Sequence, residues 1–440
     1  MGGQFRVGII GGGTGGLCLA QALRKAGVSV AVYERSGVRS DRLQGYRVHI
    51  NPKGAAALHE CLPSDQWRAF VDTCGSPGGA FGFVDEQFKD LLVIEDDVTS
   101  GAERDPARSH HSVSRITLHQ VLSAGLADVL HLDKEFERYE RAEDGTVTCH
   151  FADGTTATAD VLVGADGANS RVRRQYLPEA RRIDTGIRAI AGKLPLTDEV
   201  QRWLPRRMQD GPNNVLPPSG CGMFMAPHDL SDSLLSAAAN SVGGNDESAR
   251  LGLHFDNTTS YLMWAYAANQ DAFSCGATQL STLDGSGLRD LAGRQVAGWH
   301  PDLRRMVAET PGETVTLLPI RTSVPVNQWD TTNVTVLGDA IHSMTPFRGI
   351  GANTALRDAQ LLARNLIDAA EGGRELLAAI RDYETQMIDY GFAAVRLSLR
   401  TAEQTVSNNR LGRSMFKFAL RVFTLVPPLK RKVFADLGND

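Results

Sequence analysis

Three short apolar segments of the chain are each followed directly by glycine. Residues 7–10 precede a glycine-rich turn, an apolar stretch over residues 17–26 and a second apolar segment over residues 28–33. The other two segments are residues 161–163 and residues 334–337. The short segments predict buried strands and the longer stretch predicts a helix, so the N-terminal pattern indicates a strand–helix–strand unit.

The pattern changes in the middle of the chain. Residues 134–160 alternate between apolar and polar positions around Asp153-Gly154, which predicts a small antiparallel unit with a hairpin turn. Segments rich in methionine and aromatic residues, at 223–225 and 261–267, predict strands of a further sheet. The chain therefore combines a strand–helix–strand layer with antiparallel strands.

The turn after the first apolar segment has the sequence GGGTGG, and Glu34 ends the second predicted strand. Gly11 permits the tight turn, Gly13 lets the backbone approach a ligand, and Gly16 lets the helix pack closely on the strand. The start of the helix presents unpaired amide groups and a positive dipole end, which suits a pyrophosphate. A carboxylate at position 34 can accept both ribose hydroxyls of an adenosine. The alternative interpretation, a glycine-rich turn without a ligand, explains neither the helix nor the downstream acid.

Two later motifs complete a set of three. Residues 164–171 read GADGANSR, residues 338–342 read GDAIH, and Pro346 and the sequence GIGAN follow the latter. Together the three motifs resemble those of the FAD-dependent aromatic hydroxylases, the single-component group A flavoprotein monooxygenases. The resemblance implies that Asp166 lies near the pyrophosphate and that Asp339 contacts the ribityl chain. It also implies that the helix starting near Gly351 points its amide groups at the pyrimidine edge, where reduced flavin is negatively charged.

The resemblance further implies a set of positions around FAD. Arg115 matches an arginine of the family that contacts the cofactor, and its alternative role is a solvated arginine at the start of a helix. No catalytic base is nominated, since the flavin performs the chemistry; Arg47, Pro346 and Arg348 are the candidates near its reactive edge. The expected FAD-binding residues are Gly11, Gly13, Thr14, Gly15, Gly16, Glu34, Arg35, Arg115, Asp166, Asp339, Gly349, Gly351, Ala352 and Asn353.

The expected fold class is α/β, with a Rossmann-like FAD-binding domain, an inserted and mainly antiparallel β substrate domain, and C-terminal helices. The FAD-binding domain is expected to be discontinuous, with the substrate domain inserted into it and a helical segment after it. The expected boundaries are residues 1–75, 101–180 and 318–372 for the FAD-binding domain, 76–100 and 181–317 for the substrate domain, and 373–440 for the helical segment.

The apolar strands of the substrate domain suit a ring-shaped organic substrate. Met223, Met225, Met263 and Trp264 are the candidates to line its pocket, and plain sheet core is the alternative interpretation for most of them. Because no anchor for a simple benzoate is recognisable, the expected substrate is a hydrophobic aromatic or polycyclic small molecule.

The resemblance implies a reaction as well. NADPH or NADH reduces non-covalently bound FAD, O2 adds at flavin C4a, and the hydroperoxide delivers one oxygen atom to the substrate. Epoxidation and Baeyer–Villiger oxygenation are alternatives on the same scaffold. So are a flavin dehydrogenase or reductase without oxygen insertion and a non-enzymatic redox-sensing module. A flavin halogenase is disfavoured because the chain has no Trp-x-Trp-x-Ile-Pro segment.

Composition and charge limit the classes of partner that the protein is expected to bind. The 440 residues include 42% hydrophobic and 22% charged residues, as in an ordinary globular enzyme, and the net charge of −5 argues against nucleic-acid binding. Six scattered cysteines without CxxC spacing predict free thiols, and neither a disulfide framework nor a bound metal is expected. No segment is long enough to span a bilayer, and cytoplasmic localisation is expected. The basic amphipathic stretch from Arg410 is expected to pack on the body of the protein, with membrane contact the less favoured role.

Overall fold

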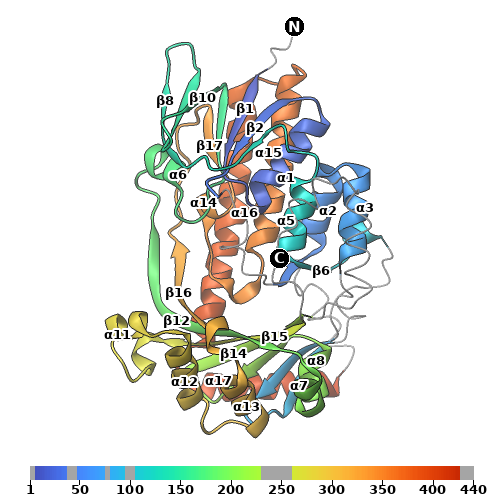
Figure 1. The fold of residues 1–440 in the computed structure, drawn as a ribbon, viewed down its shortest axis with the longest axis vertical. Helices are drawn as coiled ribbons and strands as arrows, with labels where there is room; N and C mark the ends of the chain where they lie inside the picture. Colours follow the sequence, from blue (N-terminus) through green and yellow to red (C-terminus); the bar gives the residue numbers. More distant parts are fainter. Residues whose placement is uncertain (1–4, 37–46, 75–79, 95–104, 229–259, 427–440) are drawn as a thin grey trace.

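The computed structural model describes residues 5–36, 47–74, 80–94, 105–228 and 260–426. Figure 1 shows an upper α/β body and a lower sheet with its own helices. The long strands β12 (Arg182–Pro195) and β16 (Thr316–Ser323) pass between them and connect the two parts. The antiparallel part is therefore held to the α/β part by paired strands.

A five-stranded parallel sheet forms the centre of the upper body. Three of its strands, β1, β11 and β17, are buried on both faces, which explains their continuous apolar sequences. β11 pairs with one side of β1 and β2 with the other, so the strand order reverses beside β1, where ligands of such sheets bind. In the order β17-β11-β1-β2-β7, the strands are Val334–Val336, Val161–Gly164, Arg6–Ile10, Ser29–Tyr33 and Leu130–His131.

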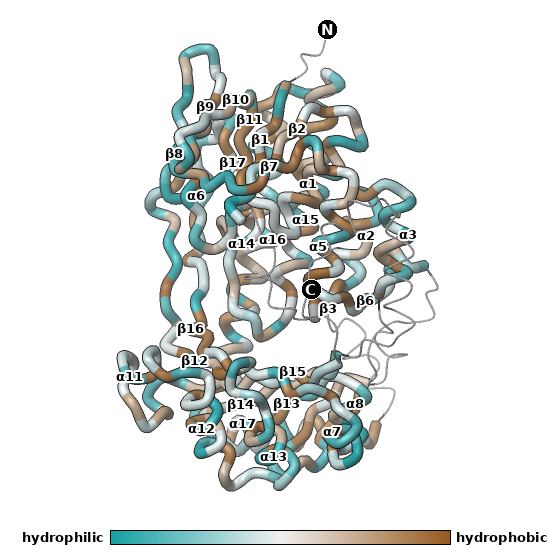
Figure 2. Tube along the Cα trace, viewed as in Figure 1, coloured by the Kyte–Doolittle hydropathy of each residue, from teal (hydrophilic) through white to brown (hydrophobic). Residues whose placement is uncertain are grey.

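Helices cover this sheet, and two small antiparallel units flank it. α1 (Thr14–Lys25) packs against α15 (Gly351–Ala370), and Figure 2 shows the brown apolar strands beside these helices. β8, β9 and β10 form the hairpin unit predicted for residues 134–160. The remaining elements here are β3 (Arg47–Ile50), β6 (His111–Ser114), β8 (Phe136–Arg141), β9 (Val147–Phe151), β10 (Thr156–Ala159), α2 (Pro52–Cys61), α3 (Ser64–Thr73), η1 (Pro106–Arg108), α5 (Arg115–Ser123), α6 (Arg171–Tyr176), α14 (Asp339–His342) and η4 (Pro346–Arg348).

The lower part is a seven-stranded sheet of order β16-β12-β15-β14-β13-β4-β5. One of its faces packs on helices α12 and α13 and forms a second hydrophobic core. The opposite face is turned toward the upper body (Figure 1). Its further elements are β4 (Phe81–Asp85), β5 (Asp90–Ile94), β13 (Asn213–Leu216), β14 (Cys221–His228), β15 (Tyr261–Asn269), α7 (Asp198–Trp203), α8 (Arg206–Asp210), η2 (Gln270–Ala272), α11 (Ala277–Thr282), α12 (Gly285–Gln295), α13 (Pro301–Glu309) and η3 (Gly312–Thr314).

Two helices end the described chain, α16 (Leu376–Thr405) and α17 (Arg410–Leu425). α16 packs against α15 and carries Glu384, whose carboxylate is completely buried. That carboxylate accepts hydrogen bonds from Thr331 Oγ1 at 2.6 Å and Thr335 Oγ1 at 2.9 Å. Burial nevertheless raises the pKa of Glu384 to about 7.

Two expectations from the sequence concern the pairing of the cysteines and the length of apolar helices. All six cysteines are free, and Cys18, Cys61 and Cys149 are buried. Among the helices that the structure describes, none combines the length and the apolar character that crossing a bilayer requires.

Candidate cofactor site

The β1–α1 turn has the backbone geometry of an anion-binding loop. Gly11 has a φ of 110°, and a Cβ there would lie 2.4 Å from the carbonyl oxygen of Ala165. A Cβ on Gly16 would lie 2.2 Å from the carbonyl oxygen of Gly11. Gly13 differs, because nothing lies within 4 Å of its added Cβ. Packing therefore requires glycine at positions 11 and 16, whereas Gly13 borders open space at the start of α1.

Glu34 connects this turn to the end of β2. Its Oε2 accepts a hydrogen bond from the amide of Gly12 at 2.7 Å, and its Oε1 accepts one from the amide of Ser36 at 3.0 Å. Each carboxylate oxygen thus keeps accepting capacity for a further donor. Arg35 is exposed, and Thr14 is half-buried at the first position of α1.

The second motif places a carboxylate at the end of β11. Asp166 Oδ2 accepts hydrogen bonds from the amides of Arg171 at 2.7 Å and Val172 at 3.3 Å, at the start of α6. Its Oδ1 is buried and has no hydrogen-bond partner among the described residues. Burial raises the pKa of the Asp166 carboxyl, and the hydrogen bonds to its oxygens oppose that rise. A buried oxygen of this kind requires a partner, which a bound ligand can supply.

Arg173 ties the second motif to the third. This buried side chain donates hydrogen bonds to the carbonyl oxygen of Ala168 at 3.2 Å and to that of Ala340 at 2.9 Å. The turns after β11 and β17 are consequently held side by side at the carboxyl edge of the sheet. Arg173 thus joins the two loops.

The Gly338-Asp339 turn lies on a buried hydrogen-bond network. Gly338 has a φ of 61°, and its amide donates to Asp358 Oδ2 at 2.7 Å. His342 Nε2 lies 2.6 Å from the same oxygen, and the Tyr390 hydroxyl donates to Oδ1 at 2.6 Å. Asp358 is fully buried and Asp339 is exposed at the surface of the site. The network fixes the strained turn and leaves the motif aspartate accessible.

The same network controls the charge of His342. Burial lowers the pKa of its imidazole, but the carboxylates of Asp358 and Asp339 raise it by more, so the net direction is upward. The raised pKa favours the protonated form of the imidazole beside Asp358. Asp358 was not identified from the sequence. Its signal is its position among Leu356, Ala359 and Leu362, the apolar residues on the buried side of α15.

The N-terminus of α15 begins directly after η4. Gly349 adopts the left-handed conformation with a φ of 64°, and no side chain caps the helix that starts at Gly351. Asn353 does not cap it either, because its Oδ1 accepts from the amide of Asn51 and its Nδ2 donates to the carbonyl of His49, both at 2.9 Å. Asn353 thus holds the helix against β3, and the first amide groups of residues 351 and 352 are left for another acceptor.

The other expected site residues lie in different environments. Arg115 is exposed at the start of α5, whose first turn is capped by Ser114. In the same helix, His119 Nε2 lies 2.9 Å from the carbonyl oxygen of Gly12. Pro346 is exposed and Arg348 is half-buried, both in η4 just before α15. The side chain of Arg47 lies outside the described part of the structure, although its backbone starts β3.

The chain matches known sequence families in two segments. Residues 295–396 match the family described as FAD binding domain, and residues 9–74 match the family described as NAD(P)-binding Rossmann-like domain. A crystal structure from Photorhabdus luminescens subsp. laumondii, described as an FAD containing monooxygenase, shares the fold with a TM-score of 0.78. It is 37% identical in sequence and covers 91% of this chain and 98% of its own. The chain belongs to the FAD-dependent monooxygenases.

Two curated relatives of this FAD-dependent monooxygenase extend the comparison. A dual O-methyltransferase/FAD-dependent monooxygenase of Cercospora beticola is 30% identical over 86% of this chain, which spans only 44% of that relative's length. A 6-hydroxynicotinate 3-monooxygenase of Bordetella bronchiseptica is 27% identical over 92% of this chain and 94% of its own. The matches confirm the α/β Rossmann-like fold class predicted from the sequence.

The site of this monooxygenase fits FAD by three independent observations. Open space borders Gly13 at the start of α1, a buried oxygen of Asp166 lacks a partner among the described residues, and the N-terminus of α15 has no side-chain cap. All three lie where the parallel strands of the upper sheet have their carboxyl ends. Their spread across the loops after β1, β11 and β17 suits an extended dinucleotide better than a compact anion.

The substrate sheet corrects part of the pocket predicted from the sequence. Met223, Met225 and Trp264 are at most 2% exposed and lie in the second hydrophobic core, and Trp264 Nε1 donates to Thr310 Oγ1 at 2.8 Å. They face α12 and α13, away from the upper body. Met263 occupies the opposite face of the sheet and is half-buried. The plain-core interpretation therefore holds for three of the four candidates.

Met263 shares its face with residues that reach the third motif. Strand pairing places Phe224 opposite Ala265, on the face that also carries Met263 and Ala267. Ala267 belongs to a small apolar cluster against which Phe347 of η4 packs. The apolar face of the sheet thus meets the segment that leads into α15. Alternation along the strands identifies two faces, and only the tertiary structure shows which of them adjoins η4.

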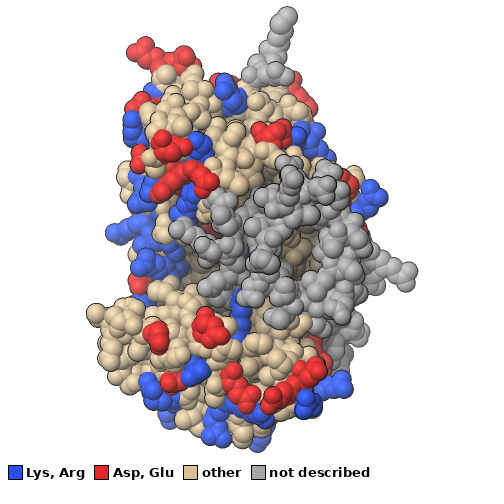
Figure 3. Space-filling view, in the orientation of Figure 1, with Lys and Arg blue, Asp and Glu red and all other residues tan. Residues whose placement is uncertain are grey.

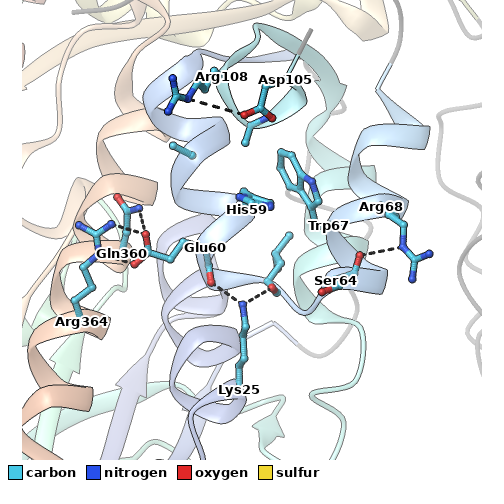
Figure 4. Close-up of a pocket in the computed structure, with 13 residues that line it drawn as sticks. Lys25, His59, Glu60, Ser64, Trp67, Arg68, Asp105, Arg108, Gln360 and Arg364 are labelled. Carbon is cyan, nitrogen blue, oxygen red and sulfur yellow. Dashed lines mark hydrogen bonds and ion pairs between the residues drawn. The ribbon is translucent and has the colours of Figure 1, made fainter.

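A separate cavity of about 760 Å³ lies between α2, α3 and α15 (Figure 4). Figure 4 shows that its charged side chains pair with one another or with backbone carbonyls. Glu60 binds Gln360 and Arg364, and Lys25 Nζ donates to the carbonyls of Glu60 and Leu62 at 2.9 and 3.0 Å. These contacts join the C-terminal end of α2 to α1 and α15.

Proposed function

We propose that this protein uses NADPH or NADH and O2 to insert one oxygen atom into a hydrophobic aromatic or polycyclic small molecule. The observation that carries the proposal is the meeting of three features at one sheet edge. These are an open phosphate turn at Gly13, an accessible Asp339, and an uncapped helix that begins at Gly351. An apolar sheet face adjoins the last of them.

The residues of this edge would hold FAD along its length. The carboxylate of Glu34 would accept hydrogen bonds from the adenosine ribose, and the amides at the start of α1 would bind the pyrophosphate. Asp339 would accept a hydrogen bond from the ribityl chain, and the amides of α15 would stabilise negative charge on the pyrimidine edge. Bound FAD supplies the activation of O2 and the transfer of one oxygen atom.

Cations near the second and third motifs support the use of a phosphorylated nicotinamide nucleotide. Arg173 lies close enough to Arg174 and Arg182 for their charges to interact, and Arg182 is also close to Asp339 and Arg321. Figure 3 shows Lys and Arg side chains gathered along the edge where β12 and β16 join the two parts. Such a cluster raises the local concentration of an anionic reductant.

The substrate class rests on the sheet face beside η4. Phe224, Met263 and Ala265 present aromatic, thioether and methyl groups, and all three are half-buried. Apolar groups of this kind bind the faces of ring systems and exclude water from the reacting atoms. The protein would contribute orientation and a dry surface, and no acid–base group of the sheet is needed for transfer to an electron-rich ring.

Substrate-dependent oxygen incorporation tests the proposal. The FAD-loaded protein would be given NADH or NADPH with phenols, polycyclic quinones or ketones under ¹⁸O-labelled O2. We expect a substrate-stimulated rate of NAD(P)H oxidation and a product that carries one labelled oxygen atom, detected by mass spectrometry. Flavin reduction without oxygen incorporation from any compound would instead establish a reductase. A best substrate that is small and highly charged would refute the proposed substrate class.

A further inference from the structure

Helix α17 presents two different stripes of side chains. One stripe packs on the edge of the lower sheet, where Leu420 is 1% exposed and joins a cluster with Leu91, Leu92 and Ile94 of β5. Thr424 Oγ1 donates to the carbonyl of Leu91 at 3.1 Å. This stripe fulfils the prediction that the amphipathic C-terminal stretch packs on the body of the protein.

The opposite stripe of α17 is apolar and exposed. Leu411, Met415, Phe418 and Leu425 are 73%, 65%, 68% and 80% exposed, and their spacing of four, three and seven residues places them on one side of the helix. Of the eight large hydrophobic side chains that are exposed in the described residues, six lie between positions 411 and 426. Single exposed apolar residues are ordinary, whereas a contiguous group marks an interaction surface.

The charges on α17 have one sign. The helix carries four cations and no acid, and the sequence from Arg410 to Ala435 has no aspartate or glutamate. Lys417 Nζ is engaged with Glu86 at 3.0 Å, and Arg413 is buried against carbonyl oxygens at the end of α16. Arg410 and Arg421 are exposed, and the guanidinium of Arg421 is 3.8 Å from Asp85 on β4. The rim of the apolar stripe therefore favours an anionic partner.

A second copy of the chain is a poor partner for this stripe. The 16 residues of α17 span about 24 Å, and a stripe about 10 Å wide offers roughly 240 Å² against the ~800 Å² per partner of a stable interface. Symmetric pairing would also bring Arg410 and Arg421 of both copies together without acids from the helix. A lipid surface has neither restriction, because it takes up a narrow apolar stripe and supplies negative charge at its rim.

We propose that α17 is an interfacial helix that binds the surface of an anionic membrane. Leu411, Met415, Phe418 and Leu425 enter the boundary between headgroups and acyl chains, while Arg410 and Arg421 contact anionic headgroups. Leu420 and Phe423 keep the helix attached to the lower sheet. The proposal concerns attachment only and does not depend on the reaction that the protein catalyses.

Vesicle co-sedimentation of the full-length protein tests this proposal. We expect binding to vesicles of phosphatidylcholine with phosphatidylglycerol, and at least about tenfold weaker binding to phosphatidylcholine alone or at high salt. The double variant Met415→Glu/Phe418→Glu should lose at least about tenfold in affinity. Leu377→Glu, the same kind of change at an exposed site on α16, is the matched control and should bind as the wild type does. Both variants should keep the wild-type melting temperature, because the replaced side chains are exposed.

Three results would overturn the proposal. The first is wild-type binding to neither kind of vesicle. The second is equal loss of binding in the double variant and the control. The third is a wild-type protein that does not bind vesicles and forms a dimer, seen by light scattering after size-exclusion chromatography, which Met415→Glu/Phe418→Glu converts to a monomer. That last result would assign the stripe to a second copy of the chain.

Discussion

Replacing Gly13 with valine separates cofactor binding from folding. Gly13 has a φ of −80° and a ψ of −176°, an extended conformation that any residue adopts, and nothing lies within 4 Å of an added Cβ. The folded chain therefore accommodates the side chain. The open space it would fill is where the pyrophosphate of FAD is proposed to approach the amides of α1.

The size of the effect follows from the contacts that valine blocks. A hydrogen bond from an amide to a charged group contributes about 1.5–3 kcal/mol, so losing one or two of them weakens FAD binding by roughly 10-fold or more. The stability cost in the absence of FAD is the smaller change at a helix N-cap, about 1 kcal/mol. We thus expect a folded protein that has lost most of its flavin.

The assay is a titration of the apoprotein with FAD, followed by flavin fluorescence, beside thermal unfolding without FAD. Gly298→Val is the matched control, because its added Cβ also meets nothing within 4 Å and the position is remote from the site. Gly16→Val should instead unfold, since its Cβ would clash with the Gly11 carbonyl at 2.2 Å. A folded Gly13→Val protein with wild-type affinity for FAD would refute the proposed position of the pyrophosphate.

Three further predictions concern the buried carboxylates and the substrate sheet. Asp358→Asn removes the carboxylate that faces His342 and should cost about 3–5 kcal/mol, measured as a lower melting temperature together with lower flavin content; unchanged values would contradict its proposed support of the Gly338 turn. Glu384 binds a proton more tightly when folded, with a pKa of about 7 against 4.5, so stability falls as the pH rises through this window. Above pH 7, Glu384→Gln should be more stable than the wild type by about 3 kcal/mol. If the difference in melting temperature between the variant and the wild type does not disappear near pH 4.5, this reasoning is contradicted. Met223→Ala should lower the melting temperature by removing core packing and leave KM unchanged, whereas Met263→Ala should raise KM and leave the melting temperature nearly unchanged; the reverse result would exchange the two faces of the sheet.

The sequence alone determined the cofactor turns, because each depends on local chemistry. Gly11 turns the chain with a positive φ, and Gly16 approaches the Gly11 carbonyl within the same strand–turn–helix unit, so both predicted roles agree with the geometry. The apolar segments before Glu34, Asp166 and Asp339 likewise predict the Rossmann-like layer, which the structure shows as a parallel sheet. A strand that is buried on both faces is apolar at nearly every position. Its sequence pattern therefore identifies it without knowledge of which face points to the core.

Only the tertiary structure decided which side chains support the site and which face the substrate. Strand alternation separates Met263 from Trp264 but does not tell which of them adjoins η4, because a shift of one residue exchanges the faces. Asp358 meets Gly338 and His342 only when α15 packs beneath the β17 turn. The apolar side chains of α17 divide into packed and exposed stripes only after β5 covers one of them. Each of these contacts joins residues distant in sequence, and their positions depend on how whole elements pack together.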